Sequence, residues 1–181
     1  YSTGGAIVTS TRLVAGVHEY ARDRSCDVGL RCANPTYPRY TPAPVTSNVR
    51  SSMHIIIREF EESDREALRN LYVASRNRAF TWSPIDHHQL ADFDSHTEGE
   101  RILIAAVEGE VLGFASIWEP ESFLHNLFVH PSATRKGIGQ ALLWNCAKYF
   151  KKPPTLKCLV ANSNALQFYK TQGWTILREE T

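Results

Sequence analysis

The chain has 181 residues, of which 43% are hydrophobic and 22% are charged, and its formal net charge is +1. This length suits one well-buried domain with an appendage, and the near-neutral charge gives no electrostatic reason to expect binding to nucleic acid or to a membrane. No apolar run approaches the length of a membrane span, and no signal-peptide pattern opens the chain.

Residues 1–52 differ in character from the rest of the chain. Residues 34–52 (NPTYPRYTPAPVTSNVRSS) contain four prolines and are predicted to form an extended linker. The pattern becomes regular after Met53, the only methionine. We therefore expect a compact domain over 53–181, preceded by an N-terminal extension or a foreign segment. An extension that packs on the domain is the alternative.

The four cysteines are Cys26, Cys32, Cys146 and Cys158, and they show neither a CxxC pair nor a metal-site spacing. This pattern indicates free thiols in a reducing cytoplasm and no metal site. A disulfide between Cys26 and Cys32 is the alternative.

The first half of the domain begins with a β-branched run at 54–60, which predicts a strand. Ser63 and Glu66 form a capping box for a helix over 64–78, and a short helix is expected around Leu90 and Phe93. Three strands then follow in a meander, at 101–107, 111–118 and 123–129.

The second half alternates helices and strands. We predict a helix over 137–150, a strand at 155–160, a helix over 162–173 and a strand at 174–178. The element order β-α-α-β-β-β-α-β-α-β indicates an α+β fold with a mixed sheet.

Residues 130–143 (HPSATRKGIGQALL) place two glycines and two cations at the start of a helix. Free N–H groups at a helix N-terminus bind phosphate, and glycine lets the backbone approach an anion closely. Arg135 and Lys136 add charge beside Gly137 and Gly139. A dinucleotide fingerprint and a P-loop are both absent, and an ordinary strand-to-helix turn is the alternative.

Two motifs in this region resemble those of the Gcn5-related N-acetyltransferase (GNAT) family. LFVHPSATRKGIGQALL, residues 127–143, is similar to the family's acyl-CoA motif R/Q-x-x-G-x-G/A, although Thr134 stands at the R/Q position. NSNALQFYKTQGW, residues 162–174, is similar to the signature N-x-x-A-x-x-F-Y-x-x-x-G-F/W. The resemblance extends over about residues 53–181.

The resemblance implies that acetyl-CoA binds between the strands at 123–129 and 155–160, which splay apart. The residues it assigns to coenzyme A are Leu127, Phe128, Val129, Arg135, Lys136, Gly137, Ile138, Gly139, Gln140, Asn162 and Tyr169. For Asn162, the alternative role is that of a helix N-cap.

The resemblance further implies an N-acetyltransferase that moves an acetyl group to a primary amine by direct attack in a ternary complex. A non-catalytic acyl-CoA-binding module is the alternative. Tyr169 matches the tyrosine that protonates the leaving thiolate, and its ring is also expected to pack in the core.

Some relatives carry a glutamate as general base at a position that corresponds to about Phe123 here. Glu119, Glu121 and His125 lie nearby, and we take His125 and Glu121 as the candidates, with a base acting through water as the alternative.

The acceptor, either a small amine or a protein amine, is expected over the first helix and the loop that follows it. Phe80, Trp82 and Asp86 are the candidate contacts, because an aromatic ring and a carboxylate attract a cation. A solvated loop without such a role is the alternative.

The family usually ends with one more strand, whereas the sequence stops at Thr181 and the last strand looks truncated. We expect residues 4–16 to cover the open edge beside 174–178, from the same chain or from the partner in a homodimer. Residues 12–33 faintly resemble the C-terminal end of formylglycine-generating-enzyme-type domains, and no activity is assigned to them.

Overall fold

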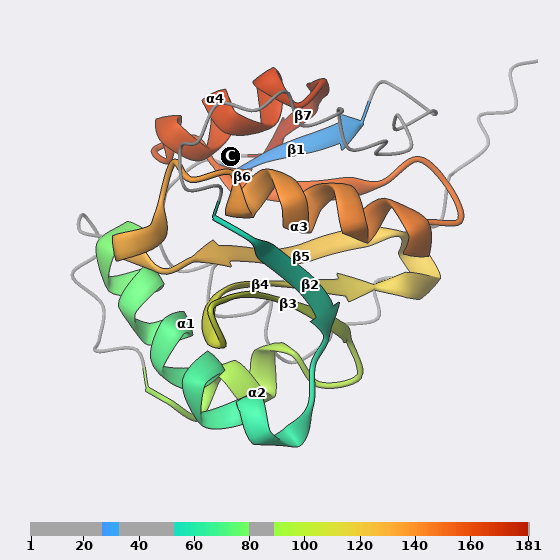
Figure 1. Ribbon diagram of the computed structural model, residues 1–181. Coiled ribbons are helices and arrows are strands. Elements are labelled where there is room, and N and C mark those ends of the chain that lie inside the picture. Colours follow the sequence, from blue (N-terminus) through green and yellow to red (C-terminus); the bar gives the residue numbers. More distant parts are fainter. Residues whose placement is uncertain (1–26, 33–52, 80–88, 181) are drawn as a thin grey trace, which may run out of the picture.

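The computed structural model describes residues 27–32, 53–79 and 89–180. They form one seven-stranded sheet in the order β2-β3-β4-β5-β6-β1-β7 (Figure 1). The strands are β1 (Asp27–Cys32), β2 (Ile55–Glu59), β3 (Arg101–Val107), β4 (Glu110–Trp118), β5 (Phe123–Val129), β6 (Thr155–Leu159) and β7 (Trp174–Glu180). The helices are α1 (Arg65–Ala79), α2 (Asp92–His96), α3 (Ile138–Cys146) and α4 (Ser163–Thr171).

The predicted α+β class and mixed sheet are confirmed. β5 and β6 pair in parallel, and the other neighbouring strands pair antiparallel. The helix predicted over 137–150 is shorter, because α3 ends at Cys146 and a 3-10 turn follows at Ala147–Tyr149.

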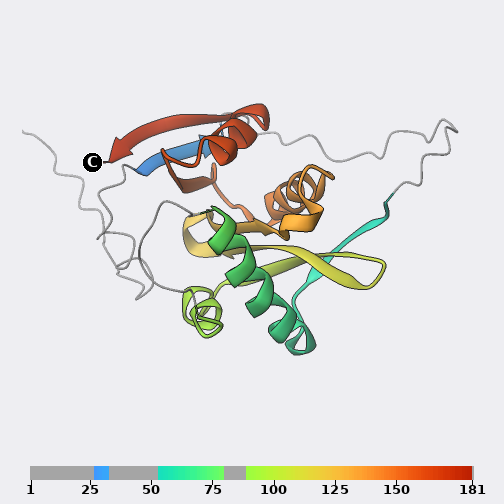
Figure 2. The same ribbon diagram turned by 90° about the vertical axis from the view of Figure 1, so that its left-hand side faces the viewer.

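Helices cover both faces of the sheet (Figure 2). Apolar side chains of α3 and α4 pack on one face, in a core that includes Leu142 and Tyr169. α1 and the segment containing α2 pack on the other face, around Tyr72, Phe93 and Phe114. This arrangement follows from the alternation of side chains along β3 and β4, which are buried on both faces.

β1 lies between β6 and β7 and pairs antiparallel with both (Figures 1 and 2). Leu30 is 0% exposed and joins the same core as α3 and α4. Among the described strands, β7 pairs with β1 alone, so β1 links β7 to the rest of the sheet.

We expected an unpaired strand edge beside β7. Residues 27–32 pair with the edge of β7 that faces β6. These residues differ from the predicted segment 4–16, which lies outside the described residues, so that prediction stays untested. The linker at 34–52 and Cys26 also lie outside them, and Cys32, Cys146 and Cys158 are buried. The domain boundary at Met53 stays a prediction.

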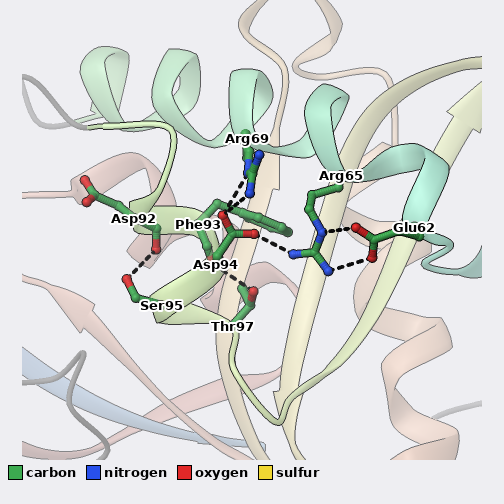
Figure 3. A network of polar contacts seen from close by, with 8 residues as sticks. All are labelled: Glu62, Arg65, Arg69, Asp92, Phe93, Asp94, Ser95 and Thr97. Carbon is green, nitrogen blue, oxygen red and sulfur yellow. Dashed lines mark hydrogen bonds and ion pairs between the residues drawn. The ribbon is translucent and has the colours of Figure 1, made fainter.

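An ionic network ties α2 to α1 (Figure 3). Arg65 and Arg69 of α1 both donate to the Asp94 carboxylate, at 2.5 and 2.8 Å, and Arg65 also binds Glu62. Burial opposes the ionisation of Asp94, but the hydrogen bonds and charges of Arg69 and Arg65 outweigh it and hold the pKa of Asp94 below its usual value. The network fixes the position of α2 and of the turn that leads into β3.

Candidate functional site

The parallel strands β5 and β6 separate soon after they meet. Their pairing consists of two residue pairs, Phe123 with Thr155 and Leu124 with Leu156. β5 stays paired with β4 as far as Val129. The edge of β5 from residue 125 to residue 129 is therefore not paired with β6, which confirms the predicted splay.

A β-bulge lies at the point of separation. Ser116 and Ile117 of β4 pair with Asn126 and Leu124 of β5, which leaves His125 as the extra residue. A bulge bends its strand and increases the local twist, and this provides a physical reason for the divergence of β5 from β6. On the far side of the bulge, the Asn126 side chain donates to the buried Ser116 hydroxyl at 2.8 Å and holds β5 on β4.

The glycine loop leads from the end of β5 into α3. Gly137 is the N-cap of α3 with φ of 84°, a left-handed conformation that favours glycine, and a Cβ there would meet nothing within 4 Å. Arg135, Lys136 and Gly137 are all exposed. The first N–H groups of a helix have no carbonyl partner within it, so the loop can accept an anion from solvent.

The first turn of α3 also contacts β5 and α4. A Cβ on Gly139 would lie 3.6 Å from both Val129 and Phe168, and Ile138 is buried in the core. The Gln140 amide donates to the Gln172 side chain at 3.1 Å. These contacts hold the free amides of α3 beside the open edge of β5.

The predicted cofactor residues of β5 differ in their packing. Leu127 and Val129 pack on the core under α3, whereas Phe128 faces α1 and lies edge-on to Tyr72, with the ring centres 5.6 Å apart. The Ser75 hydroxyl of α1 donates to the Val129 carbonyl at 3.3 Å. β5 is thus supported from both faces while one of its edges stays open.

The remaining cofactor candidates lie on α4. The Asn162 side chain accepts from the Ala165 N–H at 3.1 Å, which makes it the N-cap of the helix. Tyr169 is buried, and its ring lies edge-on to Phe168 and Trp174. The expected core packing of Tyr169 is confirmed, and its role in proton transfer stays a prediction.

The two candidate bases differ in environment. Glu121 is exposed in the turn between β4 and β5. His125 is 21% exposed at the bulge, and its Nδ1 lies 2.6 Å from the Glu100 carboxylate. The neighbouring Glu119 is engaged by Arg101 at 2.5 Å.

Sequence reasoning did not find Glu100. It directly precedes β3 and lies 25 residues from His125 in the chain, so no local sequence pattern links the two. The predicted acceptor contacts Phe80, Trp82 and Asp86 lie outside the described residues.

Together, the site combines an open strand edge with an exposed helix N-terminus that can accept phosphate. No helix among the residues that the structure describes is long and apolar enough to cross a membrane.

Comparison with known proteins identifies similar chains. The peptidyl-lysine N-acetyltransferase YiaC of Escherichia coli K12 is 31% identical over 131 residues, which cover 67% of this chain and 84% of YiaC. The structure of the PaiA N-acetyltransferase of Thermoplasma acidophilum in complex with coenzyme A is also similar, with a TM-score of 0.57 and 21% sequence identity. The match covers 66% of this chain and 89% of the PaiA chain.

A GNAT-family acetyltransferase structure from Novosphingobium aromaticivorans matches with a TM-score of 0.56 at 13% identity, over 86% of this chain and 61% of its own. These two structural matches support the fold. The model of the Acetyltransferase (GNAT) family matches residues 62–174. The chain therefore belongs to the GNAT family of acetyltransferases.

Proposed function

We propose that this protein transfers the acetyl group of acetyl-CoA to a primary amine, in a complex that holds both substrates at once. Family membership supports acyl transfer, and a coenzyme A complex among the similar structures supports the donor. The observation that carries the proposal is the open edge of β5 beside the exposed N-terminus of α3.

The residues present fit coenzyme A by their own geometry. The backbone amides of the exposed loop 135–137 and of the first turn of α3 suit its pyrophosphate, with Arg135 and Lys136 as charged partners. The unpaired backbone of Leu127, Phe128 and Val129 suits an extended amide-bearing arm, which would bind like an added strand. Acetyl-CoA would supply the activated acyl group as a thioester.

The reaction forms one bond and breaks one. The amine nitrogen attacks the thioester carbonyl carbon to form the amide bond, and the carbon–sulfur bond breaks. The ammonium ion must first lose a proton, for which we assign His125, with Glu121 or a water molecule as the alternative. The departing thiolate takes a proton from the Tyr169 hydroxyl. The attacking nitrogen loses its second proton as the amide forms, and that proton returns through water to the tyrosinate. No covalent enzyme intermediate is required.

For the acceptor we propose a lysine side chain of a protein or peptide, with a small primary amine as the second candidate. The name of the 31%-identical relative, a peptidyl-lysine N-acetyltransferase, supports the first. Phe80, Trp82 and Asp86 are the proposed acceptor contacts. The cytoplasmic location and a homodimer stay predictions.

A thiol-release assay tests this function, with acetyl-CoA as donor and lysine peptides, polyamines and amino acids as acceptors. We expect turnover with at least one amine. Tyr169→Phe should lower kcat about 100-fold with little change in the KM for acetyl-CoA. Tyr149→Phe is the matched control, because its hydroxyl binds Glu59 near the far end of α3.

Binding of coenzyme A without turnover of any amine would contradict the proposed acetyltransferase activity and favour the non-catalytic acyl-CoA-binding module.

A further inference from the structure

Glu100 holds a carboxyl group inside the protein, next to the bulge of β5. Its backbone N–H donates to the Thr97 carbonyl at 3.1 Å, which fixes the turn before β3. Its side chain is only 6% exposed. A carboxylate this buried is costly unless a hydrogen-bonding partner compensates for it, so its partner is informative.

That partner is His125. The 2.6 Å contact between Glu100 Oε1 and His125 Nδ1 is a hydrogen bond that contains one proton. An ionised carboxylate only accepts, and with Glu100 ionised we assign this proton to Nδ1. In the neutral ring, Nε2 then carries the lone pair and is the nitrogen able to take up a proton.

The second carboxylate oxygen of Glu100 is buried and has no hydrogen-bond partner among the described residues. The neighbouring cation Arg101 is engaged with Glu59 and Glu119 instead. Within the described part of the chain, the ion-pair partner of Glu100 is thus His125, and the pair is complete only when the imidazole is protonated.

His125 lies where β5 separates from β6, which is where the proposed reaction needs a proton acceptor. It is the first β5 residue after the last pair with β6, and as the extra residue of the bulge it has no partner on β4. Its ring is supported by Phe123, with the centres 5.9 Å apart. The Glu100 contact therefore fixes a ring that the sheet itself does not hold.

We propose that Glu100 is a positioning residue for proton transfer: it holds His125 with Nδ1 protonated, so that Nε2 can accept a proton from the acceptor amine. This inference rests on the proposed function. An ammonium N–H bond breaks, its proton forms an N–H bond at Nε2, and the neutral amine keeps the electron pair for attack on the thioester. The resulting imidazolium lies 2.6 Å from the Glu100 carboxylate and later releases its proton to water.

Steady-state kinetics with acetyl-CoA and the best acceptor test the proposal. Glu100→Gln keeps the shape and removes the charge, and we expect kcat to fall about tenfold to a hundredfold with the KM for acetyl-CoA unchanged. Glu98→Gln is the matched control, because Glu98 is exposed in the same turn. The double variant Glu100→Gln/His125→Gln should be no slower than His125→Gln alone, since Glu100 acts through His125.

Equal kcat in Glu100→Gln and wild type would overturn the proposal, and so would additive losses in the double variant. If Glu100→Gln fails to fold, Glu100→Asp replaces it: it keeps the charge with a shorter reach, and an intermediate kcat is expected.

Nitrogen-15 NMR of histidine-labelled protein tests the same contact without relying on turnover. The chain has seven histidines, and the signal lost in His125→Gln identifies the ring. We expect the Nδ1–H form in wild type and a changed tautomer ratio in Glu100→Gln. An Nε2–H form in wild type would overturn the inference. Absence of turnover with every amine would instead overturn the proposed function, and the NMR result would still decide whether Glu100 sets the His125 tautomer.

Discussion

Replacing Leu30 by alanine tests whether β1 completes the sheet. Leu30 is 0% exposed and lies between Leu156 of β6 and Ile176 of β7 in the strand register. Truncation of a fully buried leucine removes its burial and leaves a cavity, which costs about 3 kcal/mol. For a chain of this size, each 1 kcal/mol lowers Tm by about 2–4 °C, so a fall of about 6–12 °C is expected.

The loss should be concentrated in the C-terminal part of the sheet, because β7 reaches the other described strands through β1. Thermal unfolding measures the overall change, and hydrogen exchange followed by mass spectrometry locates it. We expect faster exchange in α4 and β7 than in β3 and β4. Arg31→Ala is the matched control, since Arg31 is exposed on the same strand and its loss should cost less than about 0.5 kcal/mol.

A Leu30→Ala variant that unfolds at the wild-type temperature, with unchanged exchange in β7, would show that β1 does not hold this position.

Two further predictions concern the rest of the fold. The hydrogen bonds from Arg58 hold the pKa of the buried Asp64 below its usual value, so the pair stabilises the fold at neutral pH and this contribution is lost as the pH falls below about 4. Asp64→Asn should therefore lower Tm at pH 7, by an amount that shrinks toward pH 3; a pH-independent difference would contradict the ion pair. Gly113→Ala would place a Cβ 2.9 Å from Ile138 and 3.0 Å from the Phe128 carbonyl, and the overpacking should cost about 1–3 kcal/mol in urea unfolding. An unchanged urea midpoint would show that α3 does not pack this closely on β4.

Most of the fold was predictable because its signals are local. Three signals determine structure within a few residues: the largely apolar runs at 101–107 and 111–118, the glycines before α3 and the asparagine before α4. The splay of β5 from β6 was expected from the family resemblance and is confirmed by the strand register.

β1 was missed because its pairing is non-local. The six residues DVGLRC pair with strands that lie more than 120 residues further along the chain. The sequence of so short a strand does not indicate which strands it pairs with. The alternation of Val28, Leu30 and Cys32 was the available signal, but the proline-rich stretch after it indicated a region outside the compact domain.

The same limit applies to the site. His125 was found from its strand position, but the bulge that frees it and the buried Glu100 that binds it depend on how distant strands align. The acceptor contacts Phe80, Trp82 and Asp86 stay predictions.

Calorimetric titration with coenzyme A tests the central claim most directly, which is that the loop into α3 binds the pyrophosphate of this donor. Gly137→Ala and Gly109→Ala form a matched pair, because both glycines have φ near 85° (84° and 85°) and open space at the Cβ position. We predict one-to-one binding by wild type and by Gly109→Ala, and affinity about tenfold weaker for Gly137→Ala, equivalent to about 1.4 kcal/mol. Absence of binding by the wild-type protein, or equal affinity in the two variants, would contradict the account.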